Sequence, residues 1–302
     1  MSVYLPIAGL SMDVFLLIGL GGIVGLVSGM FGVGGGFLLT PLLVMVGVPP
    51  AVAAGTVANQ VIGASVSGAI AQWRRGNVDV KMSLVLVLSG LAGSAAGVWL
   101  FGLLKQLGQI DVALGLSYVV LLSTLGTLMV VESARSWLRR RNPMRPRRKL
   151  HAHTWIHGLP FKMKFRASRL YISVFAPLVI GFAVGVLSGI MGVGGGFVMV
   201  PALIYLFDMP TAMAVGTSLL QITLVSANVT LLQAMGNQTV DAFLALILVI
   251  GGAAGAQIGT RFGARLQGEY VRGLLGLIVL AVGLEVAFEL AVTPAERFSL
   301  AP

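Results

Sequence analysis

The hexapeptide Gly32-Val33-Gly34-Gly35-Gly36-Phe37 occurs a second time, unchanged, as Gly192-Val193-Gly194-Gly195-Gly196-Phe197. The copies are 160 residues apart in a chain of 302 residues, and each interrupts an apolar stretch that otherwise resembles a membrane segment. A duplicated break in a duplicated hydrophobic segment is typical of secondary transporters built from two repeats. Such proteins bind their substrate where the broken helices meet.

The composition supports a membrane protein. Hydrophobic residues make up 57% of the chain and charged residues only 10%, whereas soluble domains carry roughly 25% charged residues. Apolar runs of membrane-spanning length recur along the whole chain, which predicts an all-α polytopic membrane protein. Cysteine is absent, so disulfides and thiolate chemistry are excluded.

We expect five apolar segments in each half of the chain. They are 14–30, 36–48, 51–73, 82–104 and 111–131 in the first half, and 173–190, 196–207, 210–234, 242–261 and 271–288 in the second. The halves align beyond the hexapeptides, with Pro41 matching Pro201 and Gln60 matching Gln221. The chain is therefore divided into a first membrane repeat (1–132), a basic linker (133–170) and a second membrane repeat (171–302).

The linker fixes the expected orientation. Residues 133–169 contain twelve of the chain's Lys and Arg residues and no Asp or Glu, so this loop carries the whole excess of positive charge. The positive-inside rule places it in the cytoplasm, where it would also lie against lipid headgroups. An odd number of segments per half makes the repeats inverted and puts both termini on the opposite, periplasmic side.

Segments 36–48 and 196–207 are too short for ordinary spans. About a dozen residues at 1.5 Å per residue cover less than 20 Å, below the roughly 30 Å of the hydrocarbon core. They are either re-entrant half-helices or short spans buried by their neighbours. The sequence leaves both possibilities open.

The triple glycines favour an anion site. Non-helical backbone inside a membrane survives only where protein buries it or where it lines a cavity, and the helix that follows directs its positive N-terminus at the break. We expect the backbone of two glycine triplets, Gly34, Gly35, Gly36 and Gly194, Gly195, Gly196, to donate to substrate. The alternative is that these glycines only permit close helix packing, which is the role we expect for Gly25, Gly29, Gly93, Gly97, Gly255, Gly259 and Gly263.

A second polar cluster opens the third segment of each half. Thr56 and Gln60 in the first half recur as Thr217 and Gln221 in the second, and members of each pair lie one turn apart on a helix face. These four side chains are candidate substrate donors, although interhelical hydrogen bonds would explain them equally well. Other polar residues accompany them without entering the candidate set: Asn59, Ser65, Ser67, Ser218, Thr223, Ser226 and Asn228.

Ionisable residues are nearly absent from segment interiors. Glu285 is the clearest exception and is a candidate for proton coupling, although its place near a segment end also suits an interfacial carboxylate. Asp13, Glu132, Asp241 and Glu289 lie at segment ends, where we expect solvated side chains.

The sequence lacks the motifs that are typical of metal-binding, catalytic, nucleotide-binding and nucleic-acid-binding proteins. The three histidines, His151, His153 and His157, lie in the linker without an acid or Cys to complete a metal site. Neither a catalytic residue set nor a nucleotide-binding loop is present, and no nucleic-acid-binding motif accompanies the basic linker. We therefore expect no enzyme activity, no cofactor, no metal and no nucleic-acid partner.

The doubled pattern Ser-Gly-x-x-Gly-Val-Gly-Gly-Gly-Phe, at 28–37 and 188–197, resembles the TauE/SafE sulfite exporter family, as do Pro41, Pro201 and the Gly-Thr pairs at 55–56 and 216–217. The likeness covers both repeats and implies a transporter of the bacterial inner membrane. It implies export of small sulfur-containing anions such as sulfite, sulfoacetate or related organosulfonates.

Two alternatives stay open beside this resemblance: an anion channel with the same site, and a transporter of other small carboxylates. Small-residue faces such as Gly255-Gly259-Gly263 could pack either within the chain or between the protomers of a homodimer.

Overall fold

The computed structural model describes residues 2–31, 34–141, 162–165, 167–168, 170–263 and 268–291. The three histidines and most of the basic linker lie outside the described residues. The first half forms β1 (Ser2–Leu5), β2 (Leu10–Asp13), α1 (Val14–Phe31), α2 (Gly36–Met45), α3 (Pro50–Arg74), α4 (Val80–Gln106) and α5 (Ile110–Arg141). The second half forms β3 (Lys162–Phe165), β4 (Leu170–Ser173), α7 (Phe175–Met191), α8 (Gly196–Tyr205), α9 (Thr211–Leu232), a π-helical turn (Gln233–Asn237), α10 (Ala242–Gly263) and α11 (Gly268–Ala291).

The prediction of an all-α polytopic membrane protein is confirmed. A helix lies at each of the ten expected segments. Among the described residues, five helices are long and apolar enough to cross a membrane: Val14–Phe31, Val80–Gln106, Ile110–Val131, Thr211–Asn237 and Ala242–Phe262. The helix α5 continues to Arg141, past the expected end of its segment at 131. The short β-strands form one hairpin before the first helix of each half.

The helices α2 and α8 are half-helices. Each contains ten residues, which corresponds to a length of about 15 Å. This is about half of the roughly 30 Å hydrocarbon core, so neither helix can cross a membrane alone.

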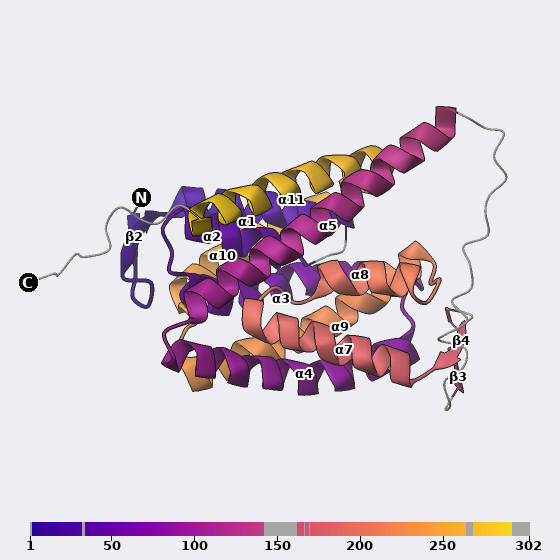
Figure 1. Ribbon diagram of the computed structural model, residues 1–302, viewed down its shortest axis with the longest axis horizontal. Coiled ribbons are helices and arrows are strands. Elements are labelled where there is room, and N and C mark those ends of the chain that lie inside the picture. Colours follow the sequence, from indigo (N-terminus) through magenta and orange to yellow (C-terminus); the bar gives the residue numbers. More distant parts are fainter. Residues whose placement is uncertain are drawn as a thin grey trace, which may run out of the picture.

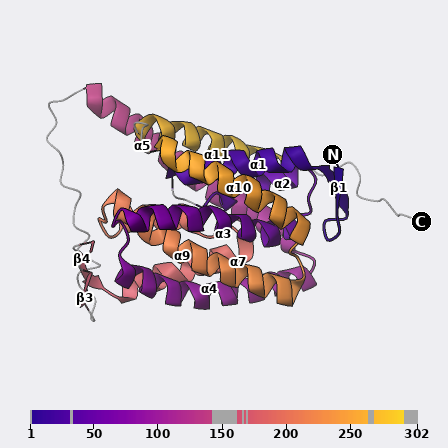
Figure 2. The ribbon, with the colours of Figure 1, turned by 180° about the vertical axis from the view of Figure 1, so that it is seen from behind.

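The two halves interlock. Helix α1 packs along α10, α4 packs along α7, α5 packs along α11, and α3 packs along α9. In the repeats, α1 of the first half corresponds to α7 of the second, and α4 corresponds to α10. The α1–α10 and α4–α7 pairs are therefore equivalent, as a two-fold axis between the halves requires. In Figure 2, α3 and α9 lie between the α1–α10 pair and the α4–α7 pair.

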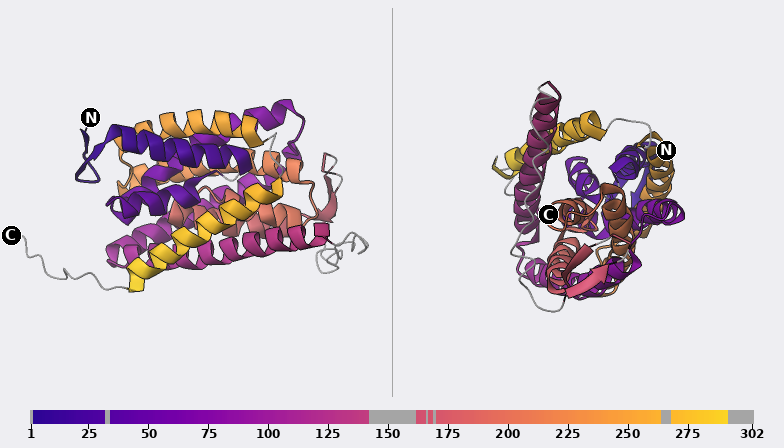
Figure 3. Two further views of the ribbon diagram at one scale, coloured as in Figure 1. Left: turned by 90° about the horizontal axis from the view of Figure 1, so that it is seen from above. Right: turned by 90° about the vertical axis from the view of Figure 1, so that its right-hand side faces the viewer.

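The halves run in opposite directions through the bundle. The β1–β2 hairpin and the start of α1 lie at one end, whereas the β3–β4 hairpin and the start of α7 lie at the other (Figure 1). The long helices α5 and α11 lie side by side along one flank of the molecule (Figures 1 and 3). This is the arrangement of inverted repeats, with each half completing the packing of the other.

Glycines permit the close approach of the exchanged helices. A Cβ atom on Gly25 of α1 would overlap the backbone of Gly252 in α10, and one on Gly97 of α4 would overlap the Val186 carbonyl of α7. The predicted packing role is confirmed for six glycines: Gly25, Gly29, Gly93, Gly97, Gly255 and Gly259. Because Gly255 and Gly259 contact the backbone of α1, this small-residue face is used within the chain.

Replacing Gly25 with Ala should destabilise the protein by about 1–3 kcal/mol, because a methyl group there meets backbone atoms that cannot move independently. Gly19→Ala in the same helix is the matched control, since a Cβ on Gly19 has no neighbour within 4 Å. It should be neutral or stabilising by up to about 1 kcal/mol. Thermal unfolding of the purified protein in detergent measures both effects, and equal midpoints for the two variants would contradict the packing described.

Candidate anion site at the two helix breaks

Each helix break is made by glycines in the left-handed backbone region. The φ angles are 88° at Gly34 and 71° at Gly35 in the first break, and 74° at Gly194 and 73° at Gly195 in the second. Other residues rarely adopt such angles without strain, which explains the need for glycine. The half-helices begin directly afterwards, with Gly35 capping α2 and Gly195 capping α8.

The two breaks converge on the same two side chains. A Cβ atom on Gly34 would lie 3.3 Å from Cγ1 of Val61 and 3.5 Å from Cγ2 of Ile222, and Gly194 contacts the same two residues. Val61 lies at the middle of α3 and Ile222 at the middle of α9. The breaks therefore meet at mid-depth in the bundle.

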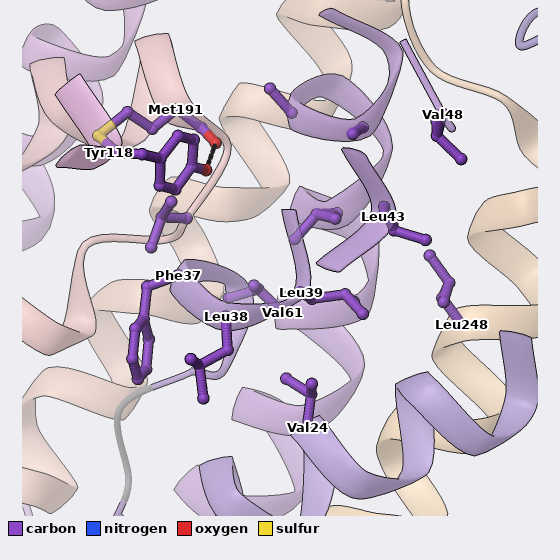
Figure 4. Close-up of a cluster of buried hydrophobic side chains, with 14 of the residues drawn as sticks. Val24, Phe37, Leu38, Leu39, Leu43, Val48, Val61, Tyr118, Met191 and Leu248 are labelled. Carbon is purple, nitrogen blue, oxygen red and sulfur yellow. Dashed lines mark hydrogen bonds between the residues drawn. The ribbon is translucent and has the colours of Figure 1, made fainter. Parts of the chain in front are cut away.

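The residues that flank the breaks also touch one another. A Cβ on Gly36 would lie 3.0 Å from the backbone of Val193. The rings of Phe37 and Phe197, which follow the glycines in α2 and α8, have centroids 5.5 Å apart. Figure 4 shows Phe37 and Val61 within the buried apolar cluster around the first break.

The convergence has an electrostatic consequence. The first backbone amides of a helix have no partner within that helix, and the aligned peptide dipoles place a partial charge of about +0.5 at its N-terminus. The helices α2 and α8 both begin at the breaks. Two N-termini therefore face one region, which is suited to binding an anion.

The predicted threonine donors are engaged elsewhere. The Oγ1 of Thr56 accepts a hydrogen bond from the amide of Asp241 at 3.0 Å, and that of Thr217 accepts one from the amide of Asp79 at 3.1 Å. Both hydroxyls thus link α3 or α9 to the segment that begins α10 or α4. Their role in binding substrate stays a prediction.

The predicted glutamine donors also face α10 and α4. Gln60 lies against Gly252 of α10, and Gln221 lies against Gly90 of α4. Each glutamine comes one residue before Val61 or Ile222, and one residue is a rotation of about 100° around a helix. The structure therefore places the glutamines on a different face of α3 and α9 from the face that meets the breaks, and their role in substrate binding stays a prediction.

Several fully buried polar groups have no hydrogen-bond partner. Among the described residues these are both amide atoms of Gln60 and Gln221 and the hydroxyls of Ser65, Ser188, Ser226 and Thr230. Each buried polar atom left unpaired costs about 1–3 kcal/mol. Such groups therefore mark places where water or a ligand would restore hydrogen bonds.

Two of these hydroxyls lie at the breaks. Ser65 and Ser226 each follow Val61 or Ile222 by one helical turn and so share their face. The Oγ of Ser65 lies 3.7 Å from a Cβ placed on Gly34, and the Oγ of Ser226 lies 2.8 Å from a Cβ placed on Gly194. The sequence repeat could have identified these two serines as an equivalent pair, because the spacing of 161 residues between Gln60 and Gln221 also relates Ser65 to Ser226.

Comparison with known proteins identifies the family. The family model described as "Sulfite exporter TauE/SafE" matches residues 17–286. The chain belongs to the TauE/SafE family.

Relatives within the TauE/SafE family carry transporter names. A "Probable membrane transporter protein" of Xylella fastidiosa (strain 9a5c) is 31% identical over 91% of this chain and 95% of its own. The "Probable membrane transporter protein YunE" of Bacillus subtilis (strain 168) is 28% identical over 92% of this chain and 98% of its own. No solved structure matches the chain. These comparisons confirm the resemblance and support a membrane transporter.

Asp241 corrects an expectation from the sequence. Its position at the end of a segment predicted a solvated side chain, but the residue is 0% exposed. One carboxylate oxygen accepts from the amides of Phe243 and Leu244 in the first turn of α10, and the other accepts from the amides of Ile7 and Ala8 in the β1–β2 loop. The side chain is buried because the hairpin covers it.

Asp79, which was not among the sequence candidates, occupies the equivalent place at the other end of this TauE/SafE bundle. The offset of 162 residues that relates Gly93 to Gly255 also relates Asp79 to Asp241. Asp79 is 2% exposed. One oxygen accepts from the amide of Met82 in the first turn of α4, and the other accepts from the amide and hydroxyl of Ser168 in the β3–β4 loop. The side chain of each Asp therefore caps a helix and holds a hairpin. Its own backbone amide donates to the hydroxyl of Thr56 or Thr217.

Other sequence candidates lie away from the breaks. Glu285 is exposed on α11. Its role in proton coupling stays a prediction.

A cavity of about 170 Å³ lies between α2, α5 and α11 and includes Tyr118, whose hydroxyl donates to the Met191 carbonyl at 2.8 Å (Figure 4). Met191 ends α7 just before the second break. The described residues contain no group of three or more His, Cys, Asp or Glu that could hold a metal.

Replacing Asp79 or Asp241 with Asn should lower the free energy of unfolding by about 1–3 kcal/mol. Both oxygens of each carboxylate accept hydrogen bonds, so either orientation of the amide directs an NH2 group at a donor. Asp208→Asn is the control, because Asp208 is exposed and Asn tolerates its φ of 53°. Chemical denaturation of the purified variants measures the differences. Asp79 and Asp241 variants that are as stable as the control would contradict the assignment.

Proposed function

We propose that this chain is a secondary transporter that moves small sulfur-containing anions out of the cell across the bacterial inner membrane. Sulfite, sulfoacetate and related organosulfonates are the expected substrates. The observation that carries the proposal is the meeting of two glycine breaks, one from each inverted repeat, with the N-termini of α2 and α8 directed at one region.

The charge at this region suits an anionic headgroup. Two helix N-termini of about +0.5 each supply about one elementary positive charge. Lys and Arg are absent from α2, α8 and α9, and in α3 the only such residue is the terminal Arg74. A full cation in a low-dielectric site would attract an anion far more strongly. Helix ends therefore favour binding that is selective for negative charge yet weak enough for release.

The choice of substrate and direction rests on the family. The description of the matching family model names sulfite export, and a three-oxygen sulfur headgroup presents acceptors in several directions. The basic linker supports the orientation, with the linker in the cytoplasm and both termini in the periplasm. Alternating access would come from rocking of the interlocked repeats around the breaks.

Flux measured in proteoliposomes tests the proposal. Purified protein is reconstituted into liposomes, which are then loaded with radiolabelled sulfite, sulfoacetate or acetate. Flux is measured with and without a pH gradient. We expect saturable flux of the two sulfur anions and accumulation against their own gradient. Flux of acetate alone would favour a carboxylate transporter, and conductive flux without accumulation would favour a channel; both results would overturn the proposal.

Gly194→Ala should reduce this flux at least tenfold, because its methyl group would collide with Val61 and with Ser226 at the second break. Gly108→Ala is the matched control. Its φ of 69° imposes the same left-handed strain on Ala, but a Cβ there has no neighbour within 4 Å. Flux and thermal stability are measured for both variants. Unchanged flux in Gly194→Ala would show that the breaks do not form the substrate path.

A further inference from the structure

We infer that the hydroxyls of Ser65 and Ser226 are the side-chain donors that hold the transported anion, one from each repeat, and that they favour a three-oxygen sulfonate or sulfite headgroup over a carboxylate. This inference rests on the proposed function. It assigns side-chain donors to the site formed by the two glycine breaks.

Position is the first argument. Ser65 lies beside Gly34 of the first break, and Ser226 lies beside Gly194 of the second. Val61 and Ile222, one turn earlier on α3 and α9, contact both breaks. The two hydroxyls therefore flank the region at which the N-termini of α2 and α8 are directed.

Unused hydrogen-bonding capacity is the second argument. Both serines are 0% exposed, and their hydroxyls have no partner in the structure. A serine buried in a helix usually satisfies its hydroxyl by donating to a carbonyl of the preceding turn. Ser67 of α3 does so to the Gly63 carbonyl, and Thr223 of α9 does so to the Leu219 carbonyl. Ser65 and Ser226 remain available to a ligand.

Symmetry is the third argument. Ser65 and Ser226 occupy equivalent positions in the inverted repeats, so their hydroxyls approach the breaks as a two-fold pair. Two hydroxyl donors and the amides of two helix ends approach from different directions, whereas the two oxygens of a carboxylate accept in one plane. A sulfonate or sulfite group has three oxygens that point in different directions, and it can accept from donors on both repeats at once.

The test is equilibrium binding to the purified protein in detergent, with titration calorimetry as the readout. The probes are sulfoacetate and malonate, two dianions that differ only in carrying a sulfonate or a carboxylate headgroup. Wild-type protein should bind sulfoacetate more tightly than malonate. Ser65→Ala and Ser226→Ala should each raise the Kd for sulfoacetate about tenfold or more, the loss expected for one hydrogen bond to a charged group. The double variant should lose the preference for sulfoacetate over malonate.

Two controls separate a binding role from a structural role. Ser67→Ala and Thr223→Val remove hydroxyls from the same helices that are already bonded within their own helix, and both should leave the Kd unchanged. Without ligand, Ser65→Ala and Ser226→Ala should unfold at the wild-type temperature or above it, because their hydroxyls have no partner to lose. Marked destabilisation of these variants without ligand would overturn the inference.

The outcomes also distinguish this inference from the proposed function. If wild-type protein neither binds nor transports sulfoacetate or sulfite, the proposed function fails and the inference fails with it. If wild-type protein binds and transports sulfoacetate while Ser65→Ala and Ser226→Ala bind it as tightly as the controls do, the function stands. In that case other groups hold the anion and the inference is overturned.

Discussion

The structure depends on a constraint that the membrane imposes on broken helices. Backbone amides and carbonyls freed from a helix cannot be left facing lipid, so a break must be covered by protein. Here both repeats cover each break: Val61 and Ile222, on α3 and α9, contact both glycine runs, and the aromatic rings of Phe37 and Phe197 pack against each other just beyond them. Each repeat thus completes the cover of the other repeat's break, which ties the pairing of the halves to the burial of the breaks.

The exchange of helices between the halves follows from the same requirement. Glycine faces bring α1 against α10 and α4 against α7 so closely that backbone meets backbone. Asp79 and Asp241 then fix the first turn of α4 and of α10. Their carboxylates accept hydrogen bonds from a hairpin, and their backbone amides donate to Thr217 or Thr56 of the opposite repeat. The result is a frame of two interlocked units with the two helix breaks at its centre, as in secondary transporters built from inverted repeats.

Much of the fold could be predicted because local patterns in the sequence specify it. Apolar length located all ten helices, and repetition of the glycine hexapeptide located the breaks. The site was harder, since the sequence shows which residues share a helix face but not which neighbour that face meets. Thr56 and Gln60 do share a face, yet that face is turned toward α10, while Ser65 lies with Val61 on the face that meets the breaks. Asp241 was misjudged for a related reason: a hairpin far away in the sequence covers it.

The most direct test of the account uses the natural absence of cysteine from the chain. Val61→Cys introduces a single thiol that contacts both breaks, and a membrane-impermeant methanethiosulfonate reagent probes it from either face of oriented vesicles. The account predicts modification from both faces, as the site opens alternately, and protection by sulfoacetate. Reactivity from one face alone, or a rate that sulfoacetate does not change, would contradict a shared, alternately exposed anion site at the meeting of the two breaks.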